Sequence, residues 1–152
     1  MSLLSLCESL YETQLSISIR ESFWVYPLLH WAHILSNSLM FGTIAFLDLR
    51  LLGWGLRDRP AGDVARQILP WTWIGFVLMF ASGALILVSD PVRYYESTLF
   101  RIKLALMVVA GLNAVVFHFT TGTPARARLT GAISLTSWIS VVLIGRAVGY
   151  FS

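Results

Sequence analysis

Four long apolar segments joined by short polar connections constrain this sequence more than any other feature. They run over about residues 22–53, 70–88, 98–121 and 130–150. A helix needs about 20 apolar residues to cross the hydrocarbon core of a bilayer. Short connections make neighbouring helices antiparallel, and in lipid each backbone group must bond within its own element, which favours helices over open strands. The sequence therefore predicts an all-α, integral membrane four-helix bundle.

The composition agrees with a single membrane domain over residues 1–152. Hydrophobic residues make up 57% of the chain and charged residues only 12%, which a soluble fold would not keep from water. The lone cysteine, Cys7, excludes an internal disulfide and a thiolate cluster. The net charge of +3 is small, and the arginines lie in short connections. The expected partner is therefore the lipid bilayer and no nucleic acid.

The N-terminal stretch, about residues 1–20, lacks the basic start of a cleavable signal peptide and carries two glutamates. Its apolar residues fall roughly on one helical face: Leu3, Leu6, Cys7, Leu10 and Ile17. We expect an interfacial amphipathic helix that lies on the membrane, with a frayed terminus as the alternative.

Arginine placement predicts the orientation. The first and third connections share one side of the bundle and carry Arg57, Arg59, Arg66, Arg126 and Arg128. The other side carries Arg20 and Arg93, with Arg101 and Lys103 just inside the third apolar segment, so the difference in positive charge is modest. Positive residues favour the cytoplasm, so both termini are expected on the opposite face.

Polar residues inside the apolar segments are the candidates for function. On a helical projection of the first span, a stripe about 80° wide contains His30, His33, Asn37, Met40 and Asp48. The third span repeats the pattern in one line with Lys103, Met107, Ala110, Ala114 and His118. Ionisable residues in a membrane face the protein interior, so both stripes should point into the bundle.

Depth along the helices separates these residues into two groups. The half nearer the termini holds His30, His33, Lys103, Met107 and Arg146, and the other half holds Asp48, Arg50, Asn113 and His118. His33 and Met107 are nearly level, whereas His118 lies some 15 Å deeper, by about 1.5 Å per residue. One haem held between His33 and His118 is therefore strained.

The first group suits a b-type haem. His33 would be the first axial ligand and Met107 or His118 the second, with His33 and His118 as the metal-binding histidines. Lys103 and Arg146 would neutralise the propionates. Copper is the alternative cofactor, held by His30, His33 and a methionine. Lys103 could instead move protons.

Some of these residues also have ordinary structural explanations. Arg50 and Arg101 are long side chains near helix ends and can reach the headgroups as anchors. His30 has the position of an interfacial histidine, and the small residues, among them Gly75, Gly83 and Gly145, are expected to let helices pack closely. No nucleophile triad, carboxylate dyad or phosphate loop is present, so catalysis by the chain alone is not expected.

The chain resembles, over nearly its whole length, a group of short four-helix bacterial membrane proteins without a known function. The segments that carry the resemblance are "IRESFWVYPLLHWAHIL", "DLRLLG", "PWTWIGFVLMFASGALIL", "DPVRYYES", "FRIKLALMVVAGLNAVVFH" and "GRAVGY". The resemblance implies the bacterial inner membrane, where the arginine placement would put both termini in the periplasm. It marks as pattern positions His33, Asp48, Arg50, Pro70, Lys103, His118 and Arg146, while His30 departs from the pattern.

A more distant similarity links the first and third spans to the HemJ-type protoporphyrinogen oxidases and the CopD-type copper-resistance domains. The early histidine and "KLALMVVAGLNAVVFH" carry it. It implies a functional pair of His33 and Lys103 and a b-type haem, without the oxidase activity. The leading expectation is a small membrane haem protein that transfers electrons to or from a redox partner. The alternatives are copper, proton or small-solute transport in a homo-oligomer, and an accessory subunit of a membrane complex.

Overall fold

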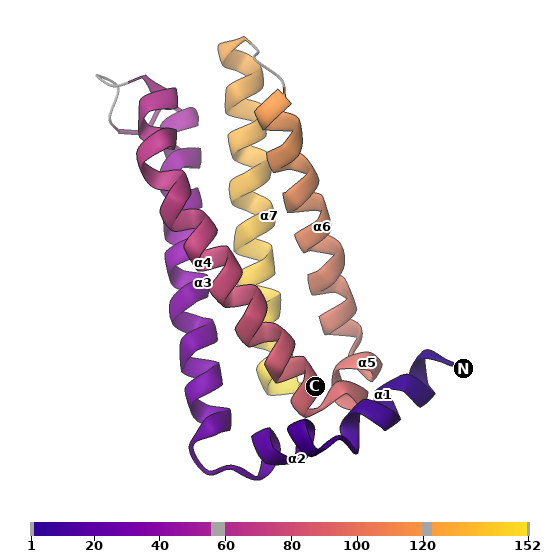
Figure 1. Cartoon of the computed structure of the whole chain (residues 1–152). Helices are drawn as coiled ribbons and strands as arrows, with labels where there is room; N and C mark the ends of the chain where they lie inside the picture. Colours follow the sequence, from indigo (N-terminus) through magenta and orange to yellow (C-terminus); the bar gives the residue numbers. More distant parts are fainter. Residues whose placement is uncertain (1, 56–59, 120–122, 152) are drawn as a thin grey trace.

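A computed structural model shows the chain as helices joined by short connections (Figure 1). It describes residues 2–55, 60–119 and 123–151, without the side chains of 116–119 and 151. The helices are α1 (Leu3–Tyr11), α2 (Gln14–Glu21), α3 (Val25–Leu51), α4 (Ala61–Ser89), α5 (Pro91–Glu96), α6 (Thr98–Phe119) and α7 (Pro124–Phe151). Four of them, α3, α4, α6 and α7, are long and apolar enough to cross a membrane. The prediction of an all-helical chain with four long apolar helices is confirmed.

The long helices form two antiparallel hairpins, α3–α4 and α6–α7 (Figure 1). The hairpins meet where α3 packs against α7, and in the described part of the chain α4 and α6 do not approach each other. Both chain ends lie at one end of the bundle together with α1, α2 and α5, and we call this the capped end. The α3–α4 and α6–α7 connections lie at the other end, which we call the loop end.

The second long helix starts earlier than the sequence predicted. We expected Pro70 to open it, but α4 begins at Ala61 and Pro70 lies inside the helix. The prediction counted only apolar residues, whereas the first turns are polar and carry an exposed Asp63–Arg66 ion pair of 2.9 Å. A proline inside a transmembrane-length helix is tolerated because local adjustments satisfy the carbonyl that it leaves free. Arg57 and Arg59, just before this helix, lie outside the described residues.

The N-terminal segment forms two helices, α1 and α2, where the sequence predicted one. The break comes at Thr13, whose hydroxyl accepts a hydrogen bond from the Ser16 backbone N–H at 3.3 Å and so caps α2. The Ser16 hydroxyl in turn donates to the carbonyl oxygen of Ser89, at the last turn of α4, at 3.1 Å. This contact ties α2 to the capped end of the bundle.

The turn after α3 depends on a glycine. Gly53 has a φ of +89°, a left-handed conformation that disfavours side chains. Its N–H bonds to the Arg50 carbonyl at 3.1 Å, and the Trp54 N–H bonds to the Leu49 carbonyl at 2.9 Å. This pair of bonds is a Schellman motif, which satisfies two of the last carbonyls of α3 and ends it.

The core lies where the hairpins meet. Its buried residues come from all four long helices: Met40, Met79, Ala110, Trp138 and Val141. The closest approach is between α3 and α4, because a Cβ on Gly75 would lie 2.8 Å from the backbone nitrogen of Met40 and 3.0 Å from the carbonyl oxygen of Ser36. Only a glycine allows the two backbones to pack at this distance.

Gly75→Ala should therefore destabilise the protein, by about 1–3 kcal/mol as for other overpacked sites. The added carbon meets backbone atoms of Met40, which cannot turn aside as a side chain can. Gly111→Ala is the matched control on α6, because a Cβ there meets nothing within 4 Å. Thermal unfolding in detergent should show a lower midpoint for Gly75→Ala alone, and equal midpoints for the two variants would contradict the close approach.

Candidate functional site

The side chain of His33 on α3 faces α4. Its Nδ1 lies 3.0 Å from the backbone carbonyl oxygen of Met79 and 3.1 Å from the hydroxyl oxygen of Ser82. A carbonyl oxygen can only accept, so Nδ1 carries a proton and donates it. In the neutral ring the other nitrogen, Nε2, then has the free lone pair. This fixes both the orientation of the imidazole and the nitrogen that is available to a ligand.

Glycines provide the space around this histidine and around Lys103. A Cβ on Gly83 of α4 would lie 3.0 Å from Cε1 of His33, which is tighter than an ordinary contact. A Cβ on Gly145 of α7 would lie 3.4 Å from Cε of Lys103. Each polar side chain thus lies against a helix surface that has no side chain of its own at that point.

Lys103 of α6 reaches the same region from the other hairpin. It is half-buried, and it is close enough to His33 for the two to interact electrostatically. One turn further along α6, Met107 is half-buried and packs against the core. Ala110 is fully buried in line with them, but Ala114, predicted on the same stripe, is exposed. The inward face of α6 therefore includes Lys103, Met107 and Ala110.

His30 takes part in a different set of contacts. Its Nδ1 lies 3.2 Å from the carbonyl oxygen of Tyr26, and the two rings are 4.5 Å apart. Tyr26 shares a hydrogen bond with Tyr94 of α5, and burial raises the pKa of Tyr94 to about 12, so that this hydroxyl stays protonated at neutral pH. His30 therefore packs against Tyr26 of its own helix, one turn from His33.

Two other residues of the predicted group, Arg146 and Asn37, lie outside the hydrogen bonds around His33. Arg146 is exposed, and its guanidinium donates to the Tyr150 hydroxyl at 2.7 Å and lies over that ring at 4.7 Å. It is directed along α7, while its neighbour Gly145 contacts Lys103. Asn37 is half-buried, one turn of α3 from His33.

The second group of polar residues lies toward the loop end. Asp48 is buried, 4% exposed, with the Ser134 hydroxyl of α7 within hydrogen-bonding range of its carboxylate. Asn113 donates from Nδ2 to the Thr130 carbonyl at 3.2 Å and so joins α6 to α7. Arg50 is half-buried near the end of α3. These residues connect helices at the loop end.

The side chain of His118 lies outside the described residues. Its backbone belongs to α6, 15 positions beyond Lys103, which is about 22 Å along a helix. The backbone of His118 is thus far from the His33 region.

Three contributions to the site could not be identified from the sequence: the Met79 carbonyl, the Ser82 hydroxyl, and the side-chain-free surfaces at Gly83 and Gly145. Gly83 and Gly145 were expected only to help helices pack. The available signal was the two adjacent small residues, Ser82 and Gly83, inside an apolar segment. A pattern in one helix, however, does not identify which residue of another helix it faces.

The hydrogen bonding of His33 makes a prediction for NMR. With ¹⁵N-labelled histidine, the neutral ring of His33 should be protonated at Nδ1, because the Met79 carbonyl requires a donor there. The spectrum of His33→Asn identifies which signals belong to this residue. A neutral ring protonated at Nε2 would contradict the geometry.

No protein-family model, curated protein or solved structure matches this chain.

Proposed function

We propose that this chain is a four-pass membrane protein that binds a b-type haem beside His33 and transfers electrons. The observation that carries the proposal is the hydrogen bond from His33 Nδ1 to the Met79 carbonyl, 3.0 Å long. Histidines that ligate metals usually donate their other ring N–H to a carbonyl, carboxylate or water, which fixes the ring and raises its basicity. His33 has this arrangement with Nε2 available.

The surroundings of His33 fit haem better than a bare metal ion. In the described part of the chain, no group of three or more His, Cys, Asp or Glu side chains is placed to hold a metal. A porphyrin supplies four nitrogens itself, so that one or two axial protein ligands suffice. Copper at His30 and His33 would have only these two imidazoles and a methionine, because no third His, Cys, Asp or Glu side chain of the described residues joins them.

Further residues would hold the group. Lys103 would pair with a propionate, since a lone carboxylate in low dielectric needs a partner. Met107 is the candidate second ligand, because it lies one turn from Lys103 on the inward face of α6. Gly83 and Gly145 keep the adjoining helix surfaces free of side chains. The side where α4 and α6 do not approach each other is where a porphyrin would enter. Bound haem would supply a one-electron couple, whose potential the axial ligands set.

The membrane placement is part of the same proposal. The first helix, α1, has exposed apolar side chains, including Leu3 at 69% and Leu6 at 46%, and would lie in the interface as an anchor. Arg66, Arg126 and Arg128 stand at the loop end, and positive residues there support a cytoplasmic position for that end. Both termini would then be in the periplasm of a bacterial inner membrane. The likeness to short four-helix bacterial membrane proteins and, more distantly, to HemJ-type domains supports this placement and the His33–Lys103 pair.

Haem binding is tested by expressing the protein with ample haem and recording its absorption spectrum. Wild-type protein should show a Soret band at near one haem per chain. His33→Asn keeps a side-chain amide that can donate to Met79 but lacks Nε2, so it should lose the band. His30→Asn, the matched control, should retain it. Ser82→Ala should weaken haem affinity by about tenfold, as loss of an outer hydrogen bond does at metal sites.

A purified wild type without a Soret band, even after haem addition, would overturn the proposed function. Equal haem content in His33→Asn and wild type would remove His33 as the ligand.

The orientation is tested by cysteine labelling in a Cys7→Ser background. Ser2→Cys lies at the capped end and Thr123→Cys at the loop end, and both positions are exposed. In intact cells with a permeabilised outer membrane, a membrane-impermeant thiol reagent should label position 2 and not position 123. The reverse pattern would contradict the proposed topology.

A further inference from the structure

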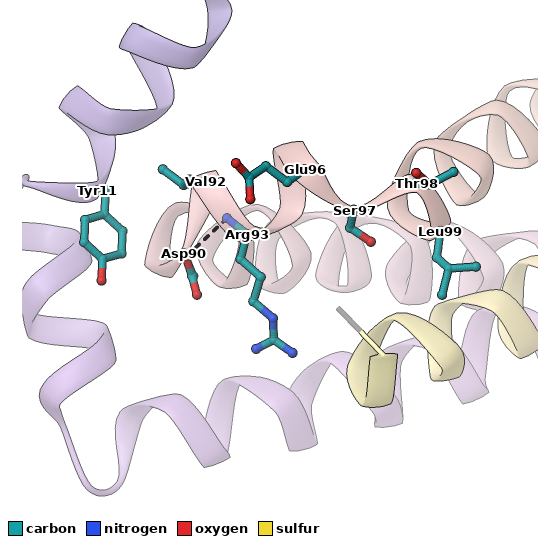
Figure 2. Close-up of a pocket in the computed structure, with 8 residues that line it drawn as sticks. All are labelled: Tyr11, Asp90, Val92, Arg93, Glu96, Ser97, Thr98 and Leu99. Atoms are coloured by element: carbon teal, nitrogen blue, oxygen red, sulfur yellow. Dashed lines mark hydrogen bonds between the residues drawn. The ribbon is translucent and has the colours of Figure 1, made fainter.

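A hollow at the capped end lies away from His33. It has a volume of about 680 Å³, within the range of about 300–1,000 Å³ typical of small-molecule sites. Figure 2 shows Tyr11 of α1 on one side and residues of α5 and the start of α6 on the other. We call it the capped-end pocket, and its polar lining residues are Tyr11, Asp90, Arg93, Glu96, Ser97 and Thr98.

The lining carries both charges. Asp90 and Glu96 contribute carboxylates, Arg93 a guanidinium, and Tyr11, Ser97 and Thr98 hydroxyls. Carboxylates accept hydrogen bonds from an ammonium group, while a guanidinium and hydroxyls donate to phosphate oxygens. This combination suits a ligand that has a cationic and an anionic group close together.

One wall of the pocket is held in place by the chain itself. The Arg20 guanidinium lies 4.0 Å above the centre of the Tyr11 ring. Arg20 also donates to the Ser89 carbonyl at 3.3 Å, at the end of α4. Ser16, which bonds the same carbonyl, is 0% exposed, and Ser89 is 1% exposed. Arg20 thus connects Tyr11 to the buried contact between Ser16 and Ser89. The pocket is therefore already formed without a ligand.

The position of the pocket in the fold indicates which part of a bilayer would surround it. Asp90 directly follows α4, and Thr98 is the first residue of α6. If α4 and α6 cross the bilayer, the pocket lies at the level of the phospholipid headgroups. Phe23 and Trp24, before α3, are 81% and 69% exposed, as expected for an aromatic belt at that level.

We propose that the capped-end pocket binds the headgroup of a phospholipid with a primary ammonium, as in phosphatidylethanolamine. The ammonium would bond to Asp90 and Glu96, and the phosphate to Arg93 and the hydroxyls of the α6 start. A choline headgroup has no N–H to donate to the carboxylates. A glycerol headgroup has no positive charge to face them. The inference rests on the proposed membrane placement and is independent of haem.

The test measures lipid binding to the full-length protein by native mass spectrometry from detergent. The probes are phosphatidylethanolamine, phosphatidylcholine and phosphatidylglycerol with identical acyl chains. Wild-type protein should bind the ethanolamine lipid about tenfold more tightly than the choline lipid, as expected for one charge-assisted hydrogen bond. The double variant Asp90→Asn, Glu96→Gln should lose this preference.

The variants are chosen to leave the fold intact. The Asp90 carboxylate caps α5 by accepting from the Arg93 N–H at 3.4 Å, and asparagine caps equally well. Glu21→Gln, exposed on α2 outside the pocket, removes a charge as the matched control and should keep the preference. Circular dichroism verifies the helix content of each variant. If the double variant fails to fold, the single variant Glu96→Gln at the exposed Glu96 replaces it and should reduce the preference.

Three results would overturn the inference. They are equal binding of the ethanolamine and choline lipids by wild type, an unchanged preference in the charge variants, and tighter binding of soluble phosphoethanolamine than of the lipid. Each of these results can occur in a protein whose cysteine labelling shows the proposed topology. They are therefore distinguishable from a failure of the membrane placement.

Discussion

The contact between Gly75 of α4 and the backbone of Met40 and Ser36 is the constraint on which the rest of this structure depends. A side chain at position 75 would hold the two helices apart. Seven residues from this contact, about 10 Å along each antiparallel helix, His33 of α3 meets Ser82 of α4. The crossing therefore fixes the register that delivers the Met79 carbonyl to the imidazole. A wider crossing would leave the histidine without its hydrogen bond partner.

Several serine and threonine hydroxyls inside the α3–α4 hairpin are hydrogen-bonded to nearby oxygen atoms. The Ser36 and Ser82 hydroxyls bond back to carbonyls of their own helices, at 2.6 Å from Ala32 and 2.7 Å from Leu78. The Thr72 hydroxyl bridges to that of Thr43 at 2.9 Å across the same pair of helices. Unsatisfied polar groups are costly in an apolar environment. The Thr72–Thr43 bond and the bond from His33 to Met79 cross between α3 and α4 and help to hold this hairpin together, and the α6–α7 hairpin brings Lys103 to it.

Two features at the capped-end half of the molecule carry the proposals for function. The His33 region is built from three of the long helices and Lys103 of the fourth, with the imidazole fixed and glycine surfaces beside it. The capped-end pocket is built from the short helices that close the bundle. A lipid headgroup held at the rim of the bundle would help to orient the protein relative to the membrane surface.

The sequence by itself determined the helical class, the number of long apolar helices and the inward stripe that includes His33, Met40 and Asp48, because apolar length and helical periodicity are local properties. It misplaced the start of α4, since polar first turns are invisible to an apolar count, and it missed α5 and the break at Thr13. Only the tertiary structure decided that His33 bonds to Met79 and Ser82, that Lys103 lies against Gly145, and that Arg146 turns instead to Tyr150. Those contacts depend on how helices distant in sequence cross and on their register, and the backbone approach at Gly75 sets both for the hairpin that holds His33.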